Sequence, residues 1–369
     1  MTVNKQEHPK ITIPAKNTAD SPDTPGQVSH QIINNPPTVW YKRLTAASVL
    51  LALVVVVLGA WVRLTDAGLG CPDWPGCYGQ IGAPQTAEDI ASANAAYPDM
   101  PVETKKAWHE MIHRYVASLL GLMIVVLTLI AYARKQERGL SSLLLGMVIF
   151  QGMLGMWTVT LLLKPVIVMA HLLGGLTVLS LLLWLLLRLH YPHNHPGTNR
   201  ISVLATTTLL VLIVQIALGG WTSTNYAATA CPDFPTCQNE IWPDNMDFAE
   251  GFVMWRGLGV NYEGGVLATP ARVAIHFAHR LWAVVTMIFI VFLAVVAVRH
   301  SWGMRFGLAG KRLKRSAITM KVLLFVQLGV AIAMILQGFP LGISTAHNAF
   351  AALLLLSTVA VLYFAREND

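Results

Sequence analysis

Eight long apolar segments most constrain what this chain can fold into. Each is long enough to cross the hydrocarbon core of a membrane as a helix, which needs about 20 mostly apolar residues. Charged residues make up only 12% of the chain, about half the share that is usual in a soluble protein. The sequence therefore predicts an all-α integral membrane protein with eight transmembrane helices, near residues 43–63, 109–132, 140–162, 166–190, 202–222, 272–298, 317–338 and 341–365.

Basic residues gather on one side of this predicted membrane protein. Of the 26 lysines and arginines, 18 fall in segments 1–43, 134–138, 188–200 and 299–321 or at Arg366, which share a side if the eight helices alternate in direction. The positive-inside rule therefore predicts that the N and C termini are both cytoplasmic. The net charge of +7 reflects this topology, and no nucleic-acid partner is expected.

Residues 1–40 are polar and rich in Pro, Asn and Thr, which predicts a disordered cytoplasmic tail. The tail contains Glu7, Asp20 and Asp23 but little arginine, unlike a mitochondrial transit peptide, and it does not resemble a cleavable signal peptide. We therefore expect a multi-pass protein of a bacterial inner (plasma) membrane, surrounded by membrane lipid.

The chain repeats itself. A Gly-x-Trp sequence at the end of the first apolar segment precedes a loop with two cysteines, and the same order returns 160 residues later, after the fifth segment. Each half contains an even number of helices, so the halves should run in the same direction, as parallel repeats about an axis along the membrane normal. The predicted parts are the tail 1–40, an N-terminal four-helix half 41–192, a cytoplasmic linker 193–200 and a C-terminal four-helix half 201–369.

The cysteines form two pairs, Cys71 with Cys77 and Cys231 with Cys237, in loops predicted to face the oxidising side of the membrane. Disulfides persist in that environment, and the Asp-aromatic-Pro turn within each pair can bring the thiols together. Two interpretations stay open: structural disulfides, or redox-active pairs that relay electrons. A shared zinc site is disfavoured because the two loops are far apart in sequence.

Four histidines fall within the apolar segments or near their outer ends: His113, His171, His279 and His347. Ionisable side chains inside a membrane are rare and usually functional. These histidines repeat, with offsets of 166 and 176 residues, so that each half has two at similar depth. Two imidazoles facing each other across a four-helix bundle suit axial ligation of a porphyrin iron. The alternative, a packed polar residue bonded to a neighbouring helix, would suffice for a single histidine but not for a repeated set of four.

Glu110 lies one helical turn before His113, whereas His276 occupies the matching position before His279. A carboxylate beside one site and an imidazole beside the other suggest that the two halves do different jobs. Glu110 is a candidate acid/base or a stabiliser of positive charge; the alternative is an ion pair with Arg114. Arg114 and Arg280 are candidates for binding heme propionates or for salt bridges elsewhere.

Three glutamines, Gln151, Gln215 and Gln327, precede small residues on the third, fifth and seventh apolar segments. Such residues commonly hold membrane helices together, and we interpret them as packing residues.

Taken together, these residues resemble the heme A synthase family, in its bacterial branch. The resemblance covers about residues 40–365. It rests on the loop from Arg63 to Cys77, on Glu110-Met-Ile-His-Arg114, on Asn261-Tyr-Glu-Gly-Gly265 with Ile275-His-Phe-Ala-His-Arg280, and on the late histidines at 171 and 347.

The resemblance implies an oxidoreductase that converts heme O to heme A, by oxidising one methyl group to a formyl group through successive hydroxylations. It implies that heme O, the substrate, lies between His113 and His171 with Glu110 beside it, these three forming the catalytic set. A heme b cofactor would lie between His279 and His347. Heme A then goes to terminal oxidases, so heme O synthase and cytochrome oxidase assembly factors are candidate partners, alongside an unidentified electron donor.

One difficulty accompanies this implication, since two axial histidines leave no open iron position for oxygen. Either one ligand moves away, or the methyl group is oxidised without a conventional iron–oxygen species. Two other functions stay open: a di-heme b-type electron-transfer protein without a substrate of its own, and a transporter with parallel repeats.

Overall fold

The computed structural model describes residues 1–2, 38–192, 199–303 and 308–366. Over these residues it contains eight helices that are long and apolar enough to cross a membrane, and its only β-type pairings are two isolated bridges. The predicted all-α fold with eight transmembrane helices is therefore confirmed. Most of the predicted tail 1–40 and linker 193–200 falls on residues 3–37 and 193–198, which lie outside the described residues.

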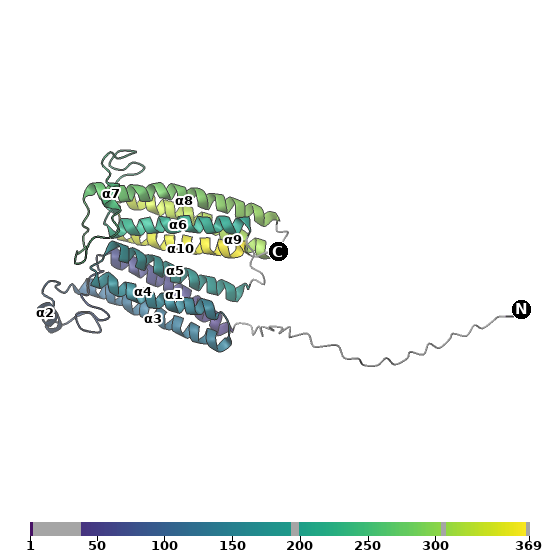
Figure 1. Cartoon of the computed structure of the whole chain (residues 1–369), viewed down its shortest axis with the longest axis horizontal. Helices are drawn as coiled ribbons and strands as arrows, with labels where there is room; N and C mark the ends of the chain where they lie inside the picture. Colours follow the sequence, from purple (N-terminus) through teal and green to yellow (C-terminus); the bar gives the residue numbers. More distant parts are fainter. Residues whose placement is uncertain (3–37, 193–198, 304–307, 367–369) are drawn as a thin grey trace, which may run out of the picture. The chain divides into compact units, whose positions relative to one another are not determined.

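The eight long helices form two groups of four (Figure 1). In the first group, α1 packs against α3 and α5, and α4 closes the ring by packing against the same two helices. In the second group, α6 packs against α8 and α10, and α9 closes the ring in the same way. The bounds are α1 Val39–Leu64, α3 Thr104–Arg134, α4 Arg138–Thr160, α5 Pro165–His190, α6 Arg200–Thr224, α8 Thr269–Gly303, α9 Leu308–Leu336 and α10 Leu341–Ala365.

Helix α10 lies where the two rings meet, because it contacts α1 and α5 of the first ring as well as its own neighbours. In its most apolar stretch 61% of residues are buried inside the protein, against 17–33% for the other seven spans. The low values mean that most apolar side chains of those spans face outward. An apolar outer surface is the surface that a membrane-embedded protein presents to lipid.

Two long loops connect the first two helices of each ring, and they contain short helices that hydropathy does not reveal. The first loop contains α2 (Ala87–Ala96), and the second contains η1 (Ala228–Ala230) and α7 (Phe248–Gly251). Helix α2 begins with a capping box in which Thr86 and Asp89 bond to each other's backbone. Figure 1 shows α2 and α7 at the same end of the helices.

The two rings are joined at this end by residues that occupy matching positions in the halves. The Arg63 guanidinium donates to the backbone carbonyl of Ser223 at 2.6 Å. The Tyr226 hydroxyl donates to the Asp66 carboxylate at 2.9 Å. Both pairs are 160 residues apart, which is the offset of the cysteine loops. The matching ends of α1 and α6 are therefore neighbours.

Candidate functional site

The four histidines form two pairs, one in each ring. His113 lies on α3 and His171 on α5, while His279 lies on α8 and His347 on α10. In each ring these two helices stand opposite each other rather than packing as neighbours. Within each pair the imidazoles are close enough to interact electrostatically. The histidines that sequence matching placed together therefore face each other across the interior of their own ring.

Glycines lie against three of these imidazoles. A Cβ atom added at Gly59 on α1 would lie 3.1 Å from Cε1 of His113, and one at Gly219 on α6 would lie 3.0 Å from Cε1 of His279. Gly155 on α4 has the same relation to His171, at 3.4 Å. A larger residue at these places would displace the ring, so the sequence leaves room for the imidazoles inside each bundle.

These sites fit a metal whose other ligands come from a macrocycle. No group of three or more His, Cys, Asp or Glu side chains able to hold a metal ion exists among the described residues. Two facing imidazoles supply only the axial positions, which is what porphyrin iron requires from a protein. In addition, Nδ1 of His113 is buried and has no hydrogen-bond partner in the part of the chain that the structure describes. The residues present therefore fit a heme in each ring.

Glu110 is buried one turn before His113, with only 5% of its surface exposed. Its carboxylate accepts the backbone N–H of Cys71 at 2.9 Å and forms an ion pair with Arg114. The ion pair considered from the sequence is therefore present. In the second ring, Arg280 donates through Nε to Nε2 of His276 at 3.2 Å. The two rings thus differ in charge beside otherwise similar histidines.

Arg114 and Arg280 also hold the cysteine loops against their helices. Arg114 donates to the backbone carbonyl of Asp73 at 3.0 Å and to that of Gly76. Arg280 donates to the matching carbonyls of Asp233, at 2.9 Å, and Thr236, at 2.8 Å. Each arginine therefore fixes the loop that covers the outer end of its ring.

Both cysteine pairs lie at disulfide distance, Cys71 with Cys77 and Cys231 with Cys237, and their Cα atoms are 4.8 and 4.6 Å apart. This is the pairing expected from the sequence, and all four cysteines are buried.

An aspartate organises the turn inside each disulfide loop. Asp73 accepts the backbone N–H groups of Tyr78 and Gly79, at 2.6 and 2.8 Å. Asp233 accepts those of Gln238 and Asn239, at 2.7 and 2.9 Å. Partial burial raises the pKa of Asp233, but hydrogen bonds from Thr236, Asn239 and Gln238 outweigh burial and leave that pKa below its usual value.

The glutamines interpreted as packing residues all contact candidate histidines. Gln151 joins α4 to α5 by donating to the backbone carbonyl of His171 at 2.7 Å. Gln215 and Gln327 instead reach imidazole rings: their Nε2 atoms lie 3.3 Å from Nδ1 of His279 and 3.1 Å from Nδ1 of His347. The packing interpretation missed these two ring contacts. A signal was available, since Gln151 and Gln327 are separated by 176 residues, the same offset as their histidines.

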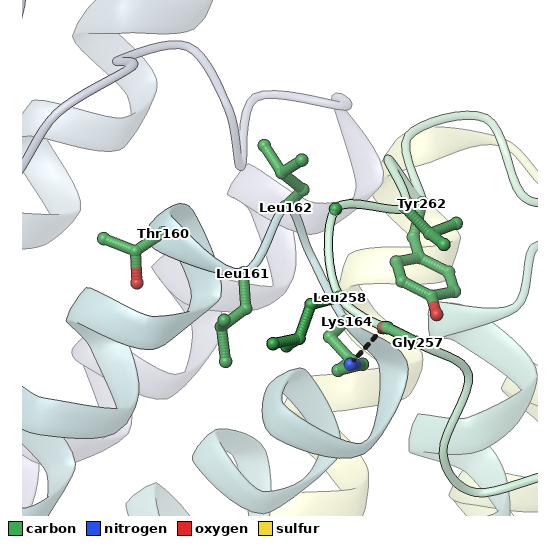
Figure 2. A pocket seen from close by; sticks show the side chains of 9 residues that line it. Thr160, Leu161, Leu162, Lys164, Gly257, Leu258 and Tyr262 are labelled. Atoms are coloured by element: carbon green, nitrogen blue, oxygen red, sulfur yellow. Dashed lines mark hydrogen bonds between the residues drawn. The ribbon is translucent and has the colours of Figure 1, made fainter.

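A small pocket lies away from the histidines, where the turn between α4 and α5 meets the second outer loop (Figure 2). Lys164 is buried there and donates to the Gly257 carbonyl at 2.6 Å. Its Nζ lies 3.5 Å from the centre of the Trp255 ring. The backbone N–H of Tyr262 donates to the Leu162 carbonyl at 3.1 Å. These contacts link the loop of one half to the helices of the other.

Comparison with known proteins agrees with the resemblance read from the motifs. Residues 42–359 match the family COX15-CtaA, described as cytochrome oxidase assembly protein. The chain is 40% identical to a heme A synthase from Shewanella oneidensis, over 88% of this chain and 96% of the relative. It is 29% identical to a heme A synthase from Mesorhizobium japonicum, over 83% and 85%. This multi-pass membrane protein therefore belongs to the COX15-CtaA family of cytochrome oxidase assembly proteins.

Proposed function

We propose that this protein is a heme A synthase, an oxidoreductase that oxidises a methyl group of heme O to a formyl group by successive hydroxylations. The observation that carries the proposal is the pair of imidazoles facing across each four-helix ring, in a chain 40% identical to a heme A synthase over nearly its whole length. Two such pairs provide for two hemes, one to be changed and one to serve the reaction.

The N-terminal half, residues 41–192, is the proposed substrate half. His113 and His171 hold heme O, and Glu110 is the proposed catalytic carboxylate because it is the buried acid nearest to His113 in sequence and is absent from the second ring. Arg114 and the N–H of Cys71 hold this carboxylate in place. From there it can accept a proton or stabilise positive charge that develops on the substrate.

The C-terminal half, residues 201–369, is the proposed cofactor half, with heme b between His279 and His347. Bound heme b supplies one-electron redox chemistry. The protein's part is to fix both imidazoles and to offer no acid next to them, since His276 and Arg280 stand where the first half has Glu110 and Arg114.

We further propose that the halves are parallel repeats and that both termini are cytoplasmic in a bacterial inner membrane. The disulfide loops, the contacts between residues 160 apart and the common end of α2 and α7 support this arrangement. Substrate would come from a heme O synthase, and the product would pass to terminal oxidases with their assembly factors.

Expression of the protein together with a heme O source, followed by extraction and mass analysis of the hemes, tests the activity. We expect hydroxylated and formyl hemes that are absent without the protein. If none forms while heme O accumulates, the activity is wrong. Glu110→Ala separates the enzyme from a di-heme electron carrier: an enzyme loses heme A formation and keeps heme b, whereas a carrier keeps its spectra and electron transfer. Glu103→Gln, an exposed acid preceding the same helix, is the matched control.

A further inference from the structure

We propose that Gln215 is a positioning residue for His279, and that its replacement by Val55 at the matching place of the first half leaves His113 the ligand that lets go most readily. This inference rests on the proposed function, in which His279 holds a resident heme and His113 holds the substrate heme. It assigns the difference in heme retention to one side chain on the first helix of each ring.

The contact comes first. Gln215 lies on α6, four residues before Gly219, so both face His279 from the same side of the helix. Its Nε2 is 3.3 Å from Nδ1 of the imidazole. Its Oε1 is buried and has no hydrogen-bond partner among the described residues. A buried amide with an unused oxygen beside an imidazole can change the group that it offers to the ring.

The chemistry of ligation says which group is needed. A histidine that binds iron through Nε2 carries its proton on Nδ1, and that proton is usually donated to an acceptor that fixes the ring. A half-turn of the Gln215 carboxamide exchanges the positions of its oxygen and nitrogen. The oxygen then accepts the proton from Nδ1 of His279. The amide therefore selects the tautomer that leaves Nε2 for iron.

The first half lacks this device. Val55 lies 160 residues before Gln215 and four residues before Gly59, the glycine that lies against His113. A valine side chain has no hydrogen-bond acceptor. Correspondingly, Nδ1 of His113 is buried without a partner in the described part of the chain. The imidazole of His113 can turn without breaking any hydrogen bond of its own ring.

The second histidine of each half differs in the same sense. Gln327 lies 3.1 Å from Nδ1 and 3.3 Å from Nε2 of the His347 ring. Its counterpart Gln151 donates to the backbone carbonyl of His171. Amide groups therefore address both rings in the cofactor half, whereas in the substrate half one is absent and the other bonds to backbone.

Loss of such an outer partner typically weakens metal binding by about 10–100-fold. A cofactor that stays needs fixed ligands, whereas a substrate that leaves as product needs ligands that release it. A ligand without a partner is also the one that can move from the iron, which answers how a site with two axial histidines could open. We therefore expect release at His113 rather than at His279.

The test uses the full-length protein, purified with its hemes, and three variants. Gln215→Val copies the first half, Gln215→Glu keeps an acceptor in place, and Val55→Gln introduces one in the substrate half. Thr206→Val is the control, because this hydroxyl on the same helix bonds only to the Ser202 carbonyl. The readouts are the midpoint potential of heme b and the rate of heme transfer to an excess of apomyoglobin.

We expect Gln215→Val to raise the potential and to speed the loss of heme b about tenfold or more, because the imidazole loses its acceptor. Gln215→Glu should lower the potential, since a carboxylate is the stronger acceptor, and it decides the matter if the valine variant does not fold. Val55→Gln should slow the loss of the substrate heme and leave heme b unchanged. Potentials and rates equal to those of Thr206→Val in both Gln215 variants would overturn the proposal.

Heme A formation, measured on the same preparations, separates this inference from the proposed function. Unchanged potentials with heme A formed would defeat the positioning role alone. Shifted potentials without heme A in the parent protein would defeat the activity and leave the positioning role supported.

Discussion

The two four-helix rings share a framework and differ in the side chains that surround it. Each ring has a histidine pair across its interior, a glycine against the first histidine and an arginine that binds the carbonyls of a disulfide loop. The differences lie beside the rings: Glu110 against His276, and Val55 against Gln215. The comparison teaches that one scaffold for holding a flat, iron-containing group can become a reaction site or a cofactor site through few substitutions.

The largest contrast should come from the residues one turn before the first histidine. Glu110→Gln keeps the size of the side chain and removes its charge and proton, so heme A formation should fall by about 100-fold or more, the usual range for a lost acid or base. His276→Gln should change the rate severalfold at most, because it removes no acid. The measurement is heme A formed per bound heme b in membranes. Equal losses in the two variants would contradict different jobs for the halves.

The disulfides give the second contrast. Removing a disulfide that closes so short a loop should lower the free energy of unfolding by roughly 2 kcal/mol in either half. Activity should fall further in Cys71→Ser with Cys77→Ser, because the N–H of Cys71 holds the Glu110 carboxylate. The matching serine pair at 231 and 237 is the control. Thermal unfolding in detergent and heme A formation measure the two effects. If the second pair reduced heme A formation more, Glu110 would not depend on its loop.

The glycines against the histidines give the smallest contrast. Gly59→Ala places a Cβ 3.1 Å from His113, and Gly219→Ala places one 3.0 Å from His279, so each ring must shift by a few tenths of an ångström. We expect Gly59→Ala to slow heme A formation severalfold with unchanged heme b spectra. Gly219→Ala should alter the heme b spectrum. Gly146→Ala on α4 meets nothing within 4 Å and serves as control; spectra that move equally in all three variants would argue against these contacts.

The helices and the histidine pairs could be predicted from sequence because their signals are long or repeated. Apolar length marks each span, and constant offsets match residues between the halves without any contact being known. Helix α2 was missed because hydropathy says nothing of a polar loop, although Thr86 and Asp89 mark its start. The partners of Arg114 are backbone carbonyls, which have no sequence signature. The ring contact of Gln215 depends on how α6 turns toward α8, which only packing decides.

The heme content of two histidine variants tests the central claim, that the two rings hold different hemes, most directly. His113→Ala and His279→Ala are expressed with a heme O source, purified in detergent, and their hemes are extracted and identified by mass. We predict that His113→Ala retains heme b and binds no heme O or heme A, whereas His279→Ala loses heme b. Loss of heme b from His113→Ala with retention in His279→Ala, or equal loss from both, would contradict the assignment of the halves.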